Sequence, residues 1–106
     1  MYTRNVSMKL KVNSAPEFTR TLEKEILPLL RKQKGFKDEI SFVAPERNEA
    51  VAISFWEKKD QAEAYSRDTY PAVLKALSQV VEGTPRVETF EVANSTSHQI
   101  AASAVN

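Results

Sequence analysis

The sequence predicts a single α+β domain, and three observations lead to this prediction. The chain has 106 residues, which is the length of one domain with a core of its own. Four segments alternate apolar and polar residues with a period of two, as strands do, and others repeat apolar residues at helical spacing. Their order is strand, helix, strand, strand, helix, strand, which is the split β-α-β, ferredoxin-like arrangement with a four-stranded antiparallel sheet.

The first strand and the first helix follow from the N-terminal third of the chain. Apolar residues at every second position of Val6–Val12 predict a strand with one apolar face. Ser14 and Glu17 have the spacing of a capping box, and the helix after them is expected to end at Gly35. The proline in Lys24–Pro28 removes a backbone donor and predicts a kink or break there.

The next two strands are predicted to form a hairpin. Ile40–Val43 alternates as a strand does, and the polar segment Ala44–Glu49 with its proline indicates the loop. The third strand runs over Ala50–Trp56 and places small residues, Ala52 and Ser54, on the same face as Trp56. Space is therefore expected beside the indole ring.

A short helix, a second helix and a fourth strand complete the predicted domain. The short helix covers about Lys59–Arg67, and Pro71 opens the second helix because proline is tolerated in a first turn. Gly83 and Pro85 are expected to end that helix before a strand at Val87–Val92. Residues 1–93 then form the domain. Residues 94–106 form a tail, for which an arm of a dimer is one role.

The predicted sheet carries helices on one face only, so its second face has to meet water or another protein. The second set of positions includes Val43, Trp56 and either Phe90 or Val87. The pattern does not say which of the two faces the helices cover. A homodimer that packs sheet on sheet would bury such residues, and two-fold pairing is the commonest oligomer.

Composition and charge exclude several classes of function. The net charge of +1 gives no field for nucleic acid or an anionic membrane, and the absence of cysteine excludes disulfides and thiolate chemistry. The single histidine, His98, cannot build a metal site by itself. No apolar run approaches the ~20 residues of a membrane span, and no signal peptide is visible. A cytoplasmic protein without a metal is expected.

Four segments resemble the antibiotic-biosynthesis-monooxygenase family over roughly residues 3–93: Leu27–Leu30, Gly35–Phe36, Phe55–Glu57 and Ala62–Tyr65. The resemblance implies a dimeric α+β barrel made of two ferredoxin-like subunits. It also implies oxidation of aromatic, quinol-like compounds with O₂ and without a cofactor. A tryptophan at the end of the third strand lines the pocket in that family, and Trp56 matches it.

Two branches of that family differ in their other site residues. A haem-degrading branch uses an asparagine on the first strand, to which Asn5 corresponds, but it also needs an axial histidine on a helix, and none lies between Trp56 and Gly83. The quinol-oxidising branch has an asparagine where this chain has Ala52. The match to the family's catalytic residues is therefore partial.

The leading hypothesis is a cofactor-independent monooxygenase for a small electron-rich aromatic such as a quinol or an anthrone. Trp56, Asn5 and Tyr65 are the candidate catalytic residues, and Trp56, Tyr65, Tyr70 and Ser54 are the candidate substrate-binding residues. Other interpretations stay open: Trp56 as a core or interface residue, Asn5 as an exposed residue near a terminus, and the tyrosines as amphipathic helix residues. The alternative function is a non-catalytic, stress-responsive dimeric barrel that binds a small aromatic or lipid-like ligand.

Overall fold

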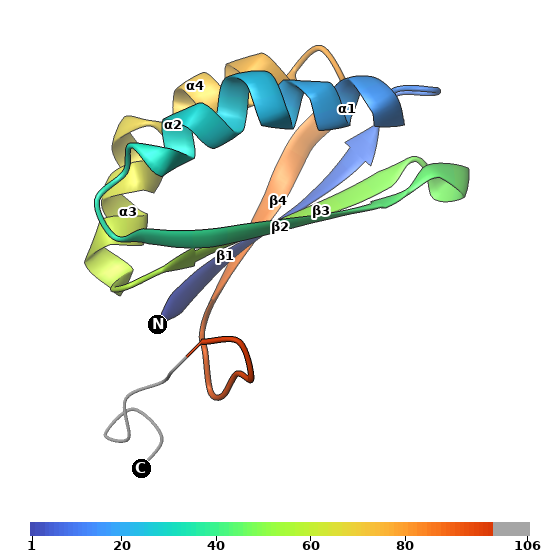
Figure 1. The fold of residues 1–106 in the computed structure, drawn as a ribbon. Helices are drawn as coiled ribbons and strands as arrows, with labels where there is room; N and C mark the ends of the chain where they lie inside the picture. Colours follow the sequence, from blue (N-terminus) through green and yellow to red (C-terminus); the bar gives the residue numbers. More distant parts are fainter. Residues whose placement is uncertain (99–106) are drawn as a thin grey trace.

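A computed structural model describes residues 1–98 and confirms the predicted fold class (Figure 1). Four antiparallel strands form one sheet in the order β2-β3-β1-β4, and the helices lie together on one face of it. The strands are β1 (Tyr2–Leu10), β2 (Phe36–Ala44), β3 (Glu49–Trp56) and β4 (Val81–Glu91). The helices are α1 (Ala15–Thr21), the π-helical turn η1 (Leu22–Ile26), α2 (Leu27–Arg31), the 3₁₀ turn η2 (Pro45–Arg47), α3 (Lys59–Asp68) and α4 (Tyr70–Leu77).

A π-helical turn interrupts the first helical segment close to the position where the sequence predicts a kink or break. The π-helical turn η1 directly precedes α2, and the backbone N–H of Leu27 donates to the carbonyl of Leu22, five residues back. A wider turn at this point accommodates Pro28, which cannot donate to the preceding turn. Ser14 stands at the N-cap of α1 but makes no side-chain cap bond, so the predicted capping box is wrong.

The C-terminal strand is longer than predicted. The helix α4 begins with Pro71 in its first turn, as expected, but it ends at Leu77, and Gly83 and Pro85 lie inside β4. A proline is tolerated there because β4 is an edge strand, in which half of the backbone donors need no partner. The prediction that these two residues only end the helix is therefore corrected.

The two faces of the sheet differ in what covers their side chains. On β3, Ala52, Ser54 and Trp56 face the helices, whereas Ile53 and Phe55 alternate with them and face away. The sequence leaves open which face the helices cover; in the structure Val43 and Trp56 pack in the core on the covered face, whereas Phe90 is exposed on the other face. We call the face without helices the open face.

The core lies between the helices and the covered face of the sheet. Its largest fully buried side chains are Trp56, Phe18 and Leu10. No helix among residues 1–98 has the length and apolar character needed to cross a membrane. After β4, the imidazole of His98 stacks on Phe55 at 5.2 Å between ring centroids, and its Nε2 lies 3.4 Å from Asp38 Oδ2. The rest of the predicted tail, residues 99–106, lies outside the described residues.

Candidate functional site

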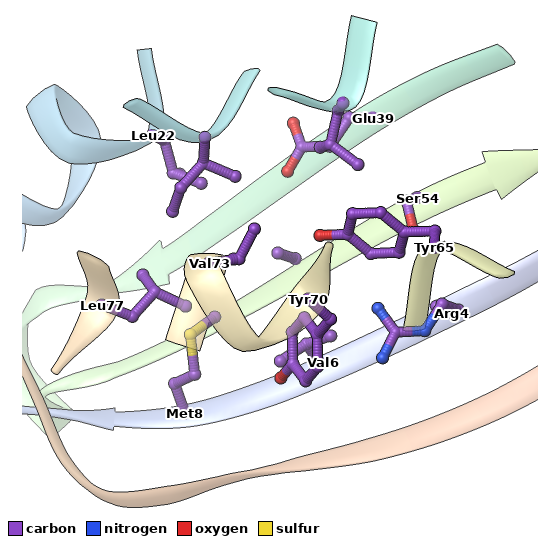
Figure 2. A pocket seen from close by; sticks show the side chains of 13 residues that line it. Arg4, Val6, Met8, Leu22, Glu39, Ser54, Tyr65, Tyr70, Val73 and Leu77 are labelled. Carbon is purple, nitrogen blue, oxygen red and sulfur yellow. The ribbon is translucent and has the colours of Figure 1, made fainter. Parts of the chain in front are cut away.

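A cavity of about 40 Å³ lies between the covered face of the sheet and the helices (Figure 2). This volume exceeds the ~10–15 Å³ that one water molecule needs, so the space holds a few waters or part of a small ligand. The small residues Ala52 and Ser54 line it, but Trp56 does not, so the cavity does not lie directly beside the indole ring as expected. Most of the wall is apolar and consists of Val6, Met8, Leu22, Ile26, Leu30, Ala52, Val73 and Leu77.

Five polar side chains complete the wall, and three of them form a row across the sheet. Arg4 on β1 is paired with Ser54 on β3, and Ser54 is paired with Glu39 on β2. Neighbouring strands are about 4.8 Å apart, so the row places a cation and a carboxylate about 10 Å apart at backbone level. Tyr65 from α3 and Tyr70 from α4 supply the other two polar groups. Figure 2 shows Tyr65 between Glu39 and Arg4.

Arg4 is a buried cation without a carboxylate partner. The residue is 3% exposed, and among residues 1–98 it forms no ion pair. Its guanidinium carbon lies 4.3 Å from the ring centroid of Tyr70 and 5.1 Å from that of Tyr65, and Nη2 donates to Ser66 Oγ at 3.4 Å. Burial lowers the pKa of Arg4, which nevertheless stays protonated because an arginine pKa starts so high. The site therefore holds a positive charge that an anionic ligand would stabilise.

The two tyrosines keep their protons at neutral pH. Burial raises the pKa of Tyr65 to about 12 and outweighs the opposite effect of nearby Arg4. Burial also raises the pKa of Tyr70, whose hydroxyl is buried and has no hydrogen-bond partner among the described residues. The guanidinium of Arg4 lies over the ring of Tyr70, 4.3 Å from the ring centroid. Both phenols can therefore act as donors to a ligand oxygen.

Glu39 is the second charged residue of the wall and is only partly buried. The hydroxyl of Ser41 donates to its Oε2. Burial raises the pKa of Glu39, more than the Ser41 hydrogen bond lowers it. The carboxyl group therefore exchanges a proton closer to neutral pH than an exposed glutamate does.

The substitution Glu39→Gln is expected to make stability less dependent on pH. Folding raises the pKa of Glu39, so the folded state favours its protonated form. The stability gained from this proton is fully present below pH 4.5, the ordinary pKa, and is lost as the pH rises through the pKa of the folded state. The glutamine variant should match the wild type at acid pH and exceed it by about 0.5 kcal/mol at pH 7, a figure reduced for solvent screening. Urea denaturation at both pH values measures the difference. Glu46→Gln, at an exposed carboxylate, is the matched control, and an equal change in both variants would contradict the prediction.

Trp56 supports the site from behind the cavity wall. The residue is fully buried, and its Nε1–H donates to Ser54 Oγ at 2.9 Å. Its ring lies 5.0 Å from that of Tyr65 and 5.7 Å from that of Phe36, between centroids, but it is not among the cavity-lining residues. Of the predicted residues, the structure therefore brings Ser54, Tyr65 and Tyr70 to the cavity and places Trp56 one layer behind them.

Asn5 lies on the open face of the sheet. Arg4 and Val6 line the cavity, and the alternation of β1 turns the residue between them to the other side. Its Oδ1 is buried and has no hydrogen-bond partner among residues 1–98. The sheet therefore separates Asn5 from the cavity. Asn5 does not meet the other candidate residues, Tyr65 and Ser54, which line the cavity from the opposite face.

Sequence reasoning missed Arg4 and Glu39. The signal for Arg4 was its position, because it is in phase with the apolar face formed by Val6 and Met8, where an arginine is unusual. Glu39 gives no comparable signal, because two adjacent acidic residues, Asp38 and Glu39, are typical of a solvent-exposed segment. No group of three or more potential metal ligands occurs in the described part of the chain.

Several solved structures share the fold of this chain, and two of them are named as oxygenases. A monooxygenase from the gene ActVA-Orf6 of Streptomyces coelicolor, in complex with the ligand nanaomycin D, matches with a TM-score of 0.75 and 14% identity, over 89% of this chain and 88% of that one. SnoaB, a cofactor-independent oxygenase from Streptomyces nogalater, matches with a TM-score of 0.66 and 18% identity, over 92% and 97%.

A third structure shares this fold. A candidate antibiotic biosynthesis monooxygenase from Bordetella bronchiseptica matches with a TM-score of 0.72 and 13% identity, over 86% of this chain and 95% of that one. No protein-family model and no curated protein sequence matches this chain. The protein therefore has the fold of antibiotic biosynthesis monooxygenases, as the sequence resemblance predicts.

Proposed function

We propose that this protein is a cofactor-independent monooxygenase that oxidises a small electron-rich aromatic, such as a quinol or an anthrone, with O₂. The observation that carries the proposal is the buried guanidinium of Arg4, which faces the cavity without a carboxylate partner. Such a cation stabilises the phenolate or enolate of the ligand, and the anion is the form of an aromatic that gives an electron to O₂ most readily. Fixed charges in a site without bulk water act strongly on such an anion.

The chemistry needs no external reductant. In the anthrone case, a ring CH₂ group and O₂ give a C=O group and H₂O, so one oxygen atom enters the product and the substrate supplies all four electrons. In this scheme Arg4 holds the anion, Tyr65 and Tyr70 donate hydrogen bonds to it, and the apolar wall excludes water. Trp56 keeps Ser54 and the ring of Tyr65 in position. We place Asn5 outside this set because of its position on the open face.

Oxygen consumption tests the proposal directly. Wild-type protein with a panel of dihydroquinones and anthrones is expected to consume O₂ above the spontaneous rate, and Trp56→Phe should consume it more slowly because the N–H that holds Ser54 is lost. An oxygen electrode measures the rates. Glu46→Gln serves as the control and should keep the wild-type rate, because Glu46 is exposed in the turn between β2 and β3 and does not line the cavity. The absence of uptake over the whole panel would contradict the proposal.

The second candidate is a non-catalytic protein that binds a small aromatic anion, as in a stress response. It is favoured by one observation: the indole N–H of Trp56 is already used by Ser54 and is not free for a substrate oxygen. The same panel separates the two functions. Thermal stabilisation by a phenol without any O₂ uptake would favour the binding protein, because a ligand that binds the folded state raises its stability.

We further propose a homodimer that packs the open faces of two sheets together. Three large apolar side chains are exposed on that face: Ile40 is 44%, Phe42 55% and Phe90 52% exposed. Exposed apolar groups of this kind typically mark an interaction surface.

The substitution Phe42→Asp is expected to convert this dimer to a monomer, since it introduces a charge into the apolar interface. Sedimentation velocity measures the mass. Val12→Asp is the matched control, because Val12 is 72% exposed but follows β1 in a turn outside the sheet. A monomeric wild type, or dissociation by both variants alike, would contradict the proposed interface.

A further inference from the structure

We propose that Glu39 is the catalytic base of this site: the ligand enters as a neutral phenol or enol, Glu39 takes its hydroxyl proton, and Arg4 holds the oxyanion that results. This inference rests on the proposed function and specifies the substrate class. In the step, the ligand O–H bond breaks, a Glu39 O–H bond forms, and the electron pair stays on the ligand oxygen. The total charge of the site does not change.

The position of Glu39 across the sheet supports this role. Arg4, Ser54 and Glu39 are consecutive partners on β1, β3 and β2, so all three face the same cavity. Arg4 and Glu39 make no ion pair, yet both act on the pKa of Tyr65, which lies between them in Figure 2. The opposite charges therefore do not neutralise each other directly: Tyr65 lies between them, and all three side chains line the cavity that a ligand would enter.

The charge balance of the cavity selects the ligand. The wall carries one cation and one carboxylate, and the other titratable groups that face Glu39 are the neutral tyrosines. A ligand that enters as an anion would leave a net negative charge beside Glu39, and burying a net charge is costly. A neutral phenol avoids this cost. Proton transfer to Glu39 then neutralises its partly desolvated carboxylate and moves the negative charge to the ligand oxygen next to Arg4.

Glu39 is also held in a way that leaves one oxygen for the ligand. Ser41, two residues along β2 on the same face, donates its hydroxyl to Oε2. Oε1 accepts no hydrogen bond from any residue that the structure describes. The neighbouring Asp38 lies next to His98 and raises the proton affinity of Glu39 through its charge. A base with a raised pKa exchanges protons efficiently near neutral pH.

Proton release on binding tests this assignment without requiring turnover. The probe is 4-nitrophenol, whose phenolate form is coloured, used at a pH below its own solution pKa. Wild-type protein is expected to bind it as the phenolate while almost no proton appears in solution, because Glu39 keeps the proton. Glu39→Gln should also bind the phenolate next to Arg4, but with release of about one proton per probe. Calorimetry in two buffers of different ionisation enthalpy measures the release.

Other outcomes of the same experiment would overturn the assignment. Equal proton release by the wild type and Glu39→Gln means that the proton goes to solvent, and no phenolate band with the wild type means that the site does not ionise a phenol. Glu46→Gln, which removes an exposed carboxylate, should behave as the wild type does. Proton capture without O₂ uptake would support Glu39 as the proton acceptor but contradict the oxygenase, so the two failures are distinguishable.

A kinetic readout separates a base from a residue with a structural role. The rate of O₂ uptake by the wild type should fall on the acid side as Glu39 becomes protonated. In Glu39→Gln this acid limb should disappear, and the plateau rate should be about 100-fold lower, the lower end of what general bases contribute. If Glu39→Gln keeps the fall in rate at acid pH, another group causes that fall, and the proposal is contradicted.

Discussion

Arg4→Met is expected to give a protein that folds more stably and oxidises its substrate much more slowly. The guanidinium is buried, and two tyrosine rings and one long hydrogen bond to Ser66 are its only polar compensation among the described residues. The cation–π contacts contribute about 1–2 kcal/mol each, less than the several kcal/mol that burial of an ion costs. We therefore expect the free energy of unfolding to rise by about 1–3 kcal/mol, measured by urea denaturation.

The same substitution removes the charge that we assign to the oxyanion. Loss of one preorganised group of this kind lowers the rate by a factor of about 100–1,000. We expect such a loss in kcat/KM for O₂ uptake. Because the variant should fold more stably than the wild type, misfolding cannot account for this loss. Arg4→Lys is the matched control, because it keeps a cation but loses the planar group that stacks on Tyr65 and Tyr70. A methionine variant with wild-type kcat/KM would show that Arg4 does not hold the oxyanion.

Trp56→Ala is expected to be the most destabilising single substitution in the site. The indole is fully buried in the core and packs against Phe36 and Tyr65, so truncation leaves a large cavity. Such substitutions cost about 3–5 kcal/mol, which is a large part of the stability of a small domain. Urea denaturation followed by far-ultraviolet circular dichroism measures the loss, since the variant has no other tryptophan to report it.

Trp56→Phe and Ser54→Ala separate packing from hydrogen bonding at this position. Each removes the bond between Nε1 and Ser54 Oγ, but only the first removes ring volume. Trp56→Phe should therefore cost more stability than Ser54→Ala, and the double variant should cost less than the sum because the two residues share one interaction. Strict additivity would mean that the hydrogen bond contributes nothing, and Trp56 would then act through packing alone.

The periodicity of the sequence was enough to determine the fold class and much of the local structure. Alternation in Val6–Val12 and Ala50–Trp56 predicts strands, and Pro28 predicts an irregularity in the helix, which the structure shows as the π-helical turn η1, because these signals depend on neighbouring residues only. The small residues Ala52 and Ser54 predict space beside the indole of Trp56; both line the observed cavity, but Trp56 itself does not.

The tertiary structure decided which residues meet in that space. A period of two assigns residues to two faces, but only the packing of the helices determines which face is covered, so Trp56 lies in the core and Asn5 lies opposite the cavity. The pairing of Arg4, Ser54 and Glu39 depends on the register of three strands that are distant in the sequence. Burial then shifts the pKa values of two residues that look ordinary in the sequence, because charge is costly away from water. It lowers the pKa of Arg4, which has no carboxylate partner among the described residues, and raises the pKa of Glu39.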